Sequence, residues 1–251
     1  MRLGVVAALS AEAGCLAGRG GLKENLFKAA ISSPQQLSGN LWLMISGIGG
    51  MQAERAAQRL IEDGADALLS WGCAGALSTH LQAGDLLIPV AVQAAGGGDF
   101  MTDSGWHARL CGALSGSANL ATDALFSSDV MVAAPQQKQV LRHSSGAVAV
   151  DMESVSIAMA ARRAQIPFMA IRAIVDDSDT AIPACINSAM DRYGNVHAAR
   201  MLRLLVKHPS LWPRLMRLGR QFKAARSTLS LAAALAGPDF SAFSPMDNLN
   251  R

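Results

Sequence analysis

Short apolar runs alternate with helical patterns along most of this chain, and this alternation restricts its fold more than any other feature. Strand-like runs cover residues 3–8, 41–46, 67–71, 85–92, 147–150 and 167–175, with one or two more expected between 118 and 132. Helical spacing covers residues 52–63, 103–114 and 153–164, and Pro135 suits the first turn of a further short helix. This order predicts an α/β protein, a three-layer α/β/α sandwich with a central mixed sheet.

The last strand-like run, PFMAIRAIV at residues 167–175, is apolar on both faces apart from Arg172. A strand of this kind must be covered on both sides, so it is expected in the middle of the sheet. Only 16% of the 251 residues are charged, whereas 51% are hydrophobic. The chain can therefore bury a sizeable core, and disorder is not expected over most of its length.

Charge and cysteine usage argue against several classes of function. The formal net charge is +3 and no basic and aromatic RNA-binding pattern occurs, so a nucleic acid partner is not expected. The four cysteines are widely spaced without a CxxC pair, which predicts neither a zinc site nor a disulfide framework. This cysteine usage favours reduced thiols in a cytoplasmic protein. No apolar stretch approaches the ~20 residues that a membrane span needs.

Three acidic residues, Glu12, Glu153 and Asp176, follow predicted strands. In open α/β sheets, ligands bind outside the carboxyl ends of the strands, so these side chains are expected to converge on one site. Glycine-rich turns are expected at residues 47–50 and 72–75, where the backbone can come close to a ligand. The alternative stays open that each carboxylate only caps a helix or interacts with its dipole.

The glycine segments do not predict a dinucleotide site. The segment at residues 47–50, GIGG, departs from GxGxxG because position 52 is Gln, and no acid ends the next strand. Three carboxylates without a metal-binding cluster instead suit acid–base cleavage of a bond to a sugar. Such cleavage builds oxocarbenium character on the sugar, while an acid protonates the leaving base and a carboxylate holds the sugar hydroxyls. No metal or organic cofactor is expected.

Several segments, in the same order, resemble the nucleoside phosphorylase and nucleosidase superfamily. The helix start AVDMESVSIA and the strand IPFMAIRAIVDDSD are similar to two of its motifs. Its glycine-rich segment resembles SWGCAGALSTHLQAGDLLIP, its G-[IM]-G helix start resembles SGIGGMQAERAA, and the opening of its nucleosidase branch resembles GVVAALSAEAG. The resemblance runs from about residue 2 to residue 206, and it implies the family's sandwich fold and cleavage of a purine nucleoside.

The resemblance also implies roles for single residues. Glu153 matches the carboxylate that binds the ribose hydroxyls, and Met152 matches the residue that packs on the sugar. Asp176 matches the acid that protonates the purine at N7, and Glu12 matches the carboxylate that activates water in the nucleosidases. Asp151 would then be mainly structural.

Further residues are assigned to the base and to the nucleophile in the same way. Met131 and Val132 lie where the family places an aromatic and an aliphatic residue against the base. Gly72 and Cys73 match the loop near the ribose and the nucleophile. Arg172 would be mainly structural.

The chain departs from the family pattern beside the catalytic aspartate and at the nucleophile. Val175 stands where the family has a serine before the catalytic aspartate, and Cys73 replaces a hydroxyl in the nucleophile loop. Ser70 stands where the hexameric phosphorylases carry an arginine that grips phosphate. Because phosphate without arginine clamps would be unusual, hydrolysis stays open beside phosphorolysis with phosphate as a co-substrate.

The segment SSDVMVAAPQQKQVLRHSSGAVAVDMES and the basic extension resemble the hopanoid-associated phosphorylases of bacteria. This resemblance implies phosphorolysis of an adenosyl-hopane-like lipid precursor in hopanoid biosynthesis. Two alternatives remain: a hydrolase of methylthioadenosine or S-adenosylhomocysteine, and a non-catalytic protein that binds a nucleoside or a lipid. The family also implies a homo-oligomer.

The chain changes character after Asp191, because residues 192–226 hold nine Lys or Arg and no Asp or Glu. We expect a catalytic domain at residues 1–206 and a basic helical extension with a loose end at residues 207–251. One face of that helix is apolar and carries or adjoins Trp212 and Phe222, which is typical of peripheral contact with a membrane surface, here the inner membrane, through residues 210–230. Packing of the apolar face on the domain or on a partner subunit is the alternative.

Overall fold

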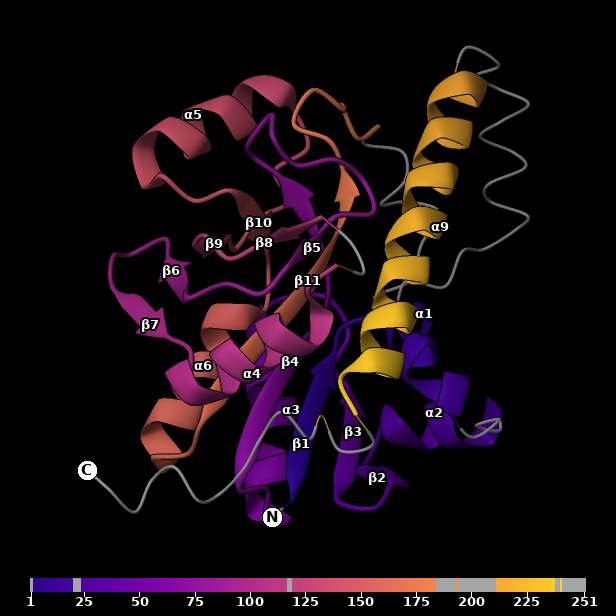
Figure 1. Cartoon of the computed structure of the whole chain (residues 1–251), viewed down its shortest axis with the longest axis vertical. Coiled ribbons are helices and arrows are strands. Elements are labelled where there is room, and N and C mark those ends of the chain that lie inside the picture. The colour runs from indigo at the N-terminus through magenta and orange to yellow at the C-terminus, as the bar shows by residue number, and fades with distance from the viewer. Residues whose placement is uncertain are drawn as a thin grey trace.

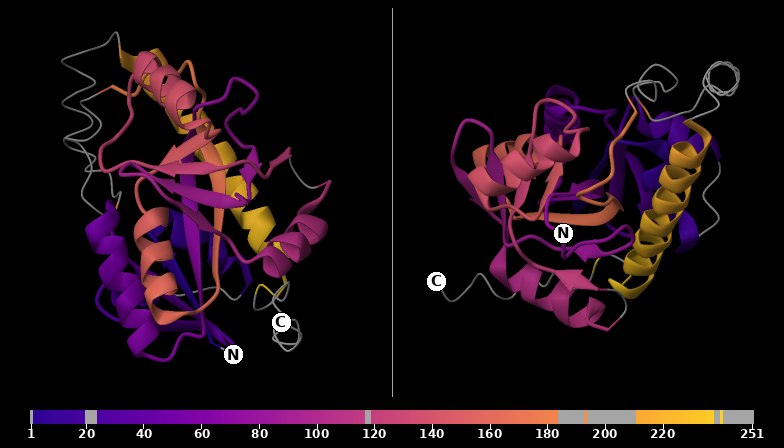
Figure 2. Two further views of the ribbon diagram at one scale, coloured as in Figure 1. Left: turned by 90° about the vertical axis from the view of Figure 1, so that its left-hand side faces the viewer. Right: turned by 90° about the horizontal axis from the view of Figure 1, so that it is seen from above.

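The computed structural model describes residues 2–19, 24–116, 119–183, 193, 211–237 and 240. A central sheet runs through the molecule, and helices cover both of its faces (Figure 1, Figure 2). The predicted boundary between residues 206 and 207, and most of the predicted loose end, lie outside the described residues.

The elements follow the predicted alternation of strands and helices. The strands are β1 (Leu3–Ala7), β2 (Gln35–Ser38), β3 (Leu41–Ile45), β4 (Ala67–Ala76), β5 (Leu86–Leu87), β6 (Ala91–Ala94), β7 (Asp99–Met101), β8 (Leu120–Ala121), β9 (Leu125–Ser127), β10 (Ala149–Asp151) and β11 (Phe168–Asp176). The helices are α1 (Ser10–Ala13), the 3-10 helix η1 (Gly14–Arg19), α2 (Glu24–Ala30), α3 (Gly50–Glu62), α4 (Ser104–Leu114), α5 (Pro135–Ser145), α6 (Ser154–Ala164) and α9 (Trp212–Leu235).

β4 is the central strand of a mixed sheet. It runs parallel to β1 and to β11, and its last two residues pair with β10 in the antiparallel direction. β3 and β2 continue the sheet beyond β1, whereas β9, β6 and β7 continue it beyond β10. β11 is buried along almost its whole length between β4 and β5, as its apolar sequence predicts. The predicted mixed sheet is confirmed.

Alternate residues of β1 enter two separate cores, because successive side chains of a strand point to opposite faces. Leu3, Val5 and Ala7 pack in one core with residues of α4 and α9. Val6 packs in the other core with residues of α3 and α6. Figure 2 (left) shows α3 and α6 side by side on one face of the sheet and α9 on the other. The predicted three-layer sandwich is therefore confirmed.

One prediction about the backbone is wrong, because residues 72–75 are not a turn but the second half of β4. They pair with β11 and, at Gly75, also with β10. Glycine has a low β-propensity, and Gly72 and Gly75 therefore led to the prediction of a turn in place of a strand. Glycine inside a strand often marks the close approach of another group, and both positions have such a group.

The predicted strand at residues 85–92 is divided into β5 and β6, with Pro89 between them. Proline has no backbone N–H for a strand ladder, which favours a break there. The glycine cluster at residues 96–98 forms the turn between β6 and β7, where Gly97 and Gly98 have φ values of 87° and 103°. Glycine adopts such positive φ values without the steric cost that other residues meet.

α9 packs its apolar side on the domain itself. Ala225, Leu229, Ala232 and Ala233 are buried, and the helix contacts β11 and η1 (Figure 1). The exposed basic residues of this helix are Arg214, Arg217, Arg220, Lys223 and Arg226. Packing on the domain, which the sequence left as an alternative, is thus present, and membrane contact through the basic face stays a prediction. In the described part of the chain, every helix is too short or too polar to cross a membrane.

Candidate active site

Two predicted site carboxylates lie against glycines in the second half of β4. A Cβ atom added to Gly72 would come within 2.8 Å of Oε1 of Glu12, and one added to Gly75 would come within 3.1 Å of Oδ1 of Asp176. Any larger residue at these positions would meet a carboxylate. The two glycines are therefore explained by the close approach of acidic groups to the strand.

Glu12 sits in α1, directly after β1, and its side chain turns back onto β4. The residue is 4% exposed. The backbone N–H of Cys73 donates to Oε1 at 2.8 Å, and the backbone N–H of Leu9 donates to Oε2 at 2.9 Å. Burial raises the pKa of Glu12 above its ordinary value, although Arg172 and these N–H groups oppose the shift. A carboxylate of raised pKa is a stronger base than an exposed one once it is ionised.

Glu153 lies directly after β10, at the N-terminal cap of α6. Its carboxylate does not cap that helix but accepts the backbone N–H of Gly49 at 2.8 Å. Gly49 has a φ of 106° and precedes α3, so the predicted glycine turn after β3 reaches this carboxylate. Burial and, next, repulsion from Asp151 raise the pKa of Glu153 to about 7. The sequence predicted each of these segments but not their contact.

A buried ion pair between Asp151 and Arg172 underlies the site. Nε and Nη2 of Arg172 donate to Oδ2 of Asp151 at 2.9 Å and 2.7 Å. Nη2 also donates to the hydroxyls of Ser70 at 2.6 Å and Ser154 at 2.8 Å. Asp151 in turn accepts the backbone N–H of Ser154 and so caps α6 beside Glu153. The pair fixes the start of the helix from which Glu153 projects.

A small cavity joins several predicted site residues. Glu12, Gly72, Cys73, Glu153 and Arg172 line it, and its volume of about 10 Å³ is at the lower limit for holding one water molecule. Burial, and then the nearby Glu12, raise the pKa of the Cys73 thiol well above its ordinary value. A raised pKa favours the thiol over the thiolate, and the thiolate is the nucleophilic form of cysteine.

Asp176 ends β11 after an irregularity in the strand. The register with β4 shifts between Ile174 and Asp176, so Asp176 rather than Val175 lies opposite Gly75. Bulges of this kind redirect side chains and are common beside active sites. Burial raises the pKa of Asp176, while its ion pair with Lys138 opposes the shift. Lys138 was not predicted as a site residue, since nothing in the PQQKQ segment distinguishes it from a surface lysine.

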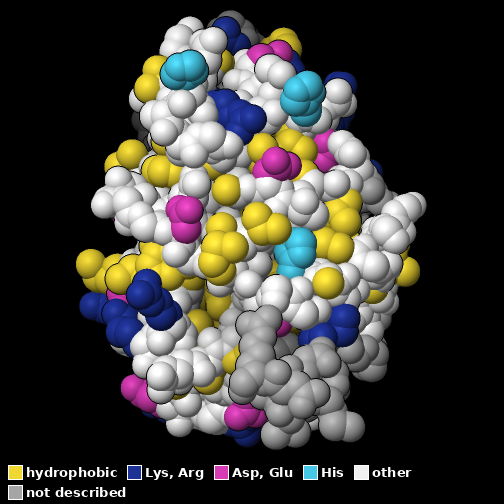
Figure 3. All heavy atoms as spheres, turned by 60° about the vertical axis from the view of Figure 1, so that its left-hand side comes forward, with side chains coloured by type: hydrophobic (Ala, Val, Ile, Leu, Met, Phe, Trp, Pro, Cys, Tyr) yellow, Lys and Arg dark blue, Asp and Glu magenta, His cyan; other side chains and the backbone are white. Residues whose placement is uncertain are grey.

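The residues predicted to contact the base are more exposed than Glu12 and Asp176. Met131 and its neighbour Val130 are 36% and 70% exposed. Val132 is partly buried against Val150 of β10 and Leu77. Met152, the residue predicted to pack on the sugar, is also partly exposed. Figure 3 shows the face on the left-hand side of Figure 1, where hydrophobic side chains gather across the middle among acidic side chains and a histidine.

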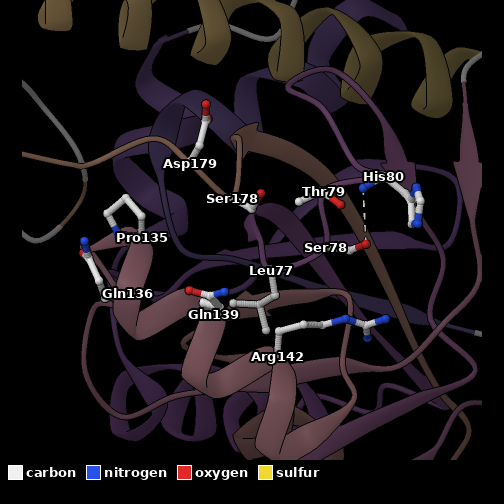
Figure 4. Close-up of a pocket in the computed structure, with 10 residues that line it drawn as sticks. All are labelled: Leu77, Ser78, Thr79, His80, Pro135, Gln136, Gln139, Arg142, Ser178 and Asp179. Atoms are coloured by element: carbon white, nitrogen blue, oxygen red, sulfur yellow. Dashed lines mark hydrogen bonds between the residues drawn. The ribbon is translucent and has the colours of Figure 1, made fainter.

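A larger pocket of about 420 Å³ lies beyond the carboxyl end of β4. Figure 4 shows that its lining comes from the segment after β4, from α5 and from the segment after β11. The lining residues are Leu77, Ser78, Thr79, His80, Pro135, Gln136, Gln139, Arg142, Ser178 and Asp179. Its size is within the range of ligand pockets, but none of the predicted site residues lines it. Glu12 and Glu153 line the smaller cavity instead, whereas Asp176 lines neither of the two. The expected convergence of three carboxylates is therefore seen in one cavity for Glu12 and Glu153 alone.

Comparison with known proteins gives a family and a fold. The model of the Phosphorylase superfamily matches residues 35–205. The futalosine hydrolase of Helicobacter pylori is similar with a TM-score of 0.65 and 16% identity, covering 93% of this chain and 96% of that chain. The 5′-methylthioadenosine/S-adenosylhomocysteine nucleosidase from Neisseria meningitidis has a TM-score of 0.63 and 19% identity, covering 92% of this chain and 97% of that chain.

The corresponding nucleosidase from S. pneumoniae has a TM-score of 0.62 and 19% identity, covering 94% of this chain and 100% of that chain. At these identities the likeness is one of fold, and it agrees with the mixed sheet and its helical layers. The family match spans more than half of the sequence. On this ground, and in agreement with the motifs that the sequence carries, the chain belongs to the phosphorylase superfamily.

Proposed function

We propose that this protein hydrolyses the N-glycosidic bond of a purine nucleoside of the adenosine type, with water as the nucleophile. The observation that carries the proposal is the acidic cavity between Glu12 and Glu153. Two carboxylates at this place favour a neutral nucleophile over an anionic one, because like charges repel strongly away from bulk water.

Phosphate would need cationic partners in the same cavity. Among the described residues that line it, Arg172 is the only cation, and its guanidinium is already bonded to Asp151 and two serine hydroxyls. Phosphate is usually bound by arginines whose N–H groups face it. The names of the structural neighbours, a hydrolase and two nucleosidases, also support hydrolysis of a nucleoside.

In the proposed reaction, Glu12 takes a proton from water while the water oxygen attacks C1′ of the ribose. The bond from C1′ to the purine breaks, its electron pair moves into the base, and Asp176 supplies a proton to the base at N7. Glu153 accepts hydrogen bonds from the ribose hydroxyls and favours the cationic sugar. The raised pKa values of Glu12 and Asp176 support a base and an acid in these two places.

A product assay tests the proposal. The purified full-length protein is incubated with adenosine, methylthioadenosine and an adenosyl lipid, with and without phosphate, and the products are identified by mass spectrometry. We expect free base and free sugar at a rate that does not depend on phosphate. Glu12→Gln should lower the rate by about 10²–10⁴-fold, the usual range for a general base. A sugar 1-phosphate as the product, with no reaction in the absence of phosphate, would contradict hydrolysis.

Phosphorolysis of an adenosyl-hopane-like lipid is the second candidate. It is supported by the exposed basic face of α9, beside which Trp212 and Met216 are 52% and 55% exposed. A lipid substrate requires an enzyme that meets the bilayer, and such a face suits anionic lipid. Turnover of the adenosyl lipid alone, dependent on phosphate, would favour this candidate. Release of no base from any substrate would favour a non-catalytic binding protein.

A further inference from the structure

Asp176 forms an ion pair with a lysine that comes from a different element, the helix α5. Lys138 projects from α5 and is completely buried, as is rare for lysine unless it is paired. Its ammonium forms an ion pair with Oδ2 of Asp176, which is only 3% exposed. Removing two charges from water is costly, so a pair at this depth calls for an explanation beyond stability.

All three N–H groups of the ammonium have acceptors on one short segment. Lys138 donates to Asp176, to the backbone carbonyl of Asp177 at 2.7 Å and to the backbone carbonyl of Thr180 at 3.2 Å. An ammonium group has three donors, so these bonds use all of them. Lys138 therefore has no donor left for a ligand, and any effect on a reaction must pass through Asp176 and its segment.

The other neighbours of Asp176 do not replace this contact. Val175 precedes Asp176 and packs against the apolar core. Its hydrocarbon side chain has no group that could form a hydrogen bond with Asp176. Gly75 faces the carboxylate from β4 without a side chain. Lys138 donates to Oδ2 of Asp176, and Oδ1 is the oxygen closest to the Cβ position of Gly75.

The charged groups around the pair are already engaged with one another. Asp177 accepts the backbone N–H of Ala83 at 2.8 Å through Oδ1. On the side of α9, Oδ2 of Asp177 accepts Gln221 at 2.7 Å and Arg217 at 2.9 Å. Asp179 also accepts Arg217 at 3.3 Å. α5 and α9 thus hold the segment after β11 from two sides, and Lys138 is the cation in direct contact with Asp176.

We propose that Lys138 is a positioning residue for the reaction: it orients the carboxyl group of Asp176 toward the leaving base and stabilises the carboxylate left after proton transfer. The inference rests on the proposed function. In the step concerned, the proton moves from Asp176 to the base, and the carboxylate that remains faces an ammonium group that keeps its own proton. Lys138 also opposes the rise in the pKa of Asp176 that burial causes.

Replacement of Lys138 separates this role from a purely structural one. Lys138→Met keeps the unbranched side chain and removes the charge, whereas Lys138→Arg keeps the charge. We expect Lys138→Met to lower kcat by about 10²-fold, within the range for general acid catalysis, with a smaller change in KM. The alkaline limb of kcat/KM should move to higher pH, because the charge that lowers the pKa of Asp176 is gone. Lys138→Arg should restore the position of the limb in part.

An NMR titration of Asp176, which does not require the protein to be catalytically active, complements the kinetic measurements. The carboxyl carbon of Asp176 is followed by ¹³C NMR in the wild type and in Lys138→Met, with Asp176→Asn to assign its signal. We expect a higher pKa for Asp176 in Lys138→Met. An unchanged titration, or a loss of kcat without movement of the alkaline limb, would overturn the positioning role. If the wild type released no base, the proposed function would fail, and the titration would still decide whether Lys138 controls the ionisation of Asp176.

Discussion

Gly72→Ala tests whether the close packing of Glu12 on β4 is required. The new Cβ would lie 2.8 Å from Oε1, 2.9 Å from Cδ and 3.0 Å from Oε2 of Glu12. Comfortable contact needs about 3.5 Å, so the carboxylate or the strand has to move by roughly half an ångström. Glu12 is held by the backbone N–H groups of Cys73 and Leu9, and such a movement breaks at least one of these bonds.

The cost follows from the type of bond that is lost. A hydrogen bond to a charged group contributes about 1.5–3 kcal/mol, so Gly72→Ala should lower the free energy of unfolding by about that amount. The unfolding equilibrium would shift by about 10- to 100-fold, because about 1.4 kcal/mol corresponds to a factor of ten. Urea unfolding followed by circular dichroism measures this change, and the rate of base release is measured on the same preparation.

Two further variants make the test specific. Gly112→Ala is the control, because a Cβ there meets no atom within 4 Å and alanine suits the helix α4. It should unfold at the same urea concentration or at a higher one. In a Glu12→Ala background, Gly72→Ala should cost much less, since the group that it meets is absent. Wild-type stability and wild-type base release in Gly72→Ala would show that the reasoning is wrong.

The remaining predictions concern the buried charges and the exposed face of α9. Arg172→Met leaves the buried carboxylate of Asp151 without its partner and should lower the free energy of unfolding, measured in urea, by about 3–5 kcal/mol. A decrease below about 1 kcal/mol is typical of an exposed ion pair and would contradict this prediction. The pKa of Glu153 is raised from 4.5 to about 7, so its contribution to stability is present below pH 4.5 and is lost as the pH rises through about 7. Glu153→Gln should therefore flatten the fall in stability across this window, and an equal pH dependence in both proteins would refute the shift. The double variant R220E/R226E on α9 should bind anionic liposomes more weakly than the wild type in a sedimentation assay. The control R55E/R59E on α3 should bind them like the wild type. Wild-type binding by R220E/R226E would exclude membrane contact through α9.

Much of the fold was predictable because it depends on local pattern. The apolar run from Leu3, the spacing in residues 153–164 and the two-sided apolar run before Asp176 each describe their own segment. In the structure these are β1, α6 and β11. The positions of Glu12, Glu153 and Asp176 after strands could also be read from the sequence, since the end of a strand is a local property.

The sequence did not determine which groups meet. Residues 72–75 form a strand because they pair with β11 and β10, and these partners lie far away along the chain. The bulge near Val175 decided that Asp176 lies opposite Gly75, and a shift of one residue changes the face on which a strand side chain lies.

The sequence by itself determined the alternation of elements, the family motifs and the placing of carboxylates at strand ends, because these properties depend on near neighbours along the chain. Only the tertiary structure brought Lys138 to Asp176, Gly49 to Glu153 and the apolar side of α9 to β11. The physical reason is that buried charges and apolar surfaces lower their free energy by finding partners in space. A lysine in a polar helical segment carries no local sign of such a partner.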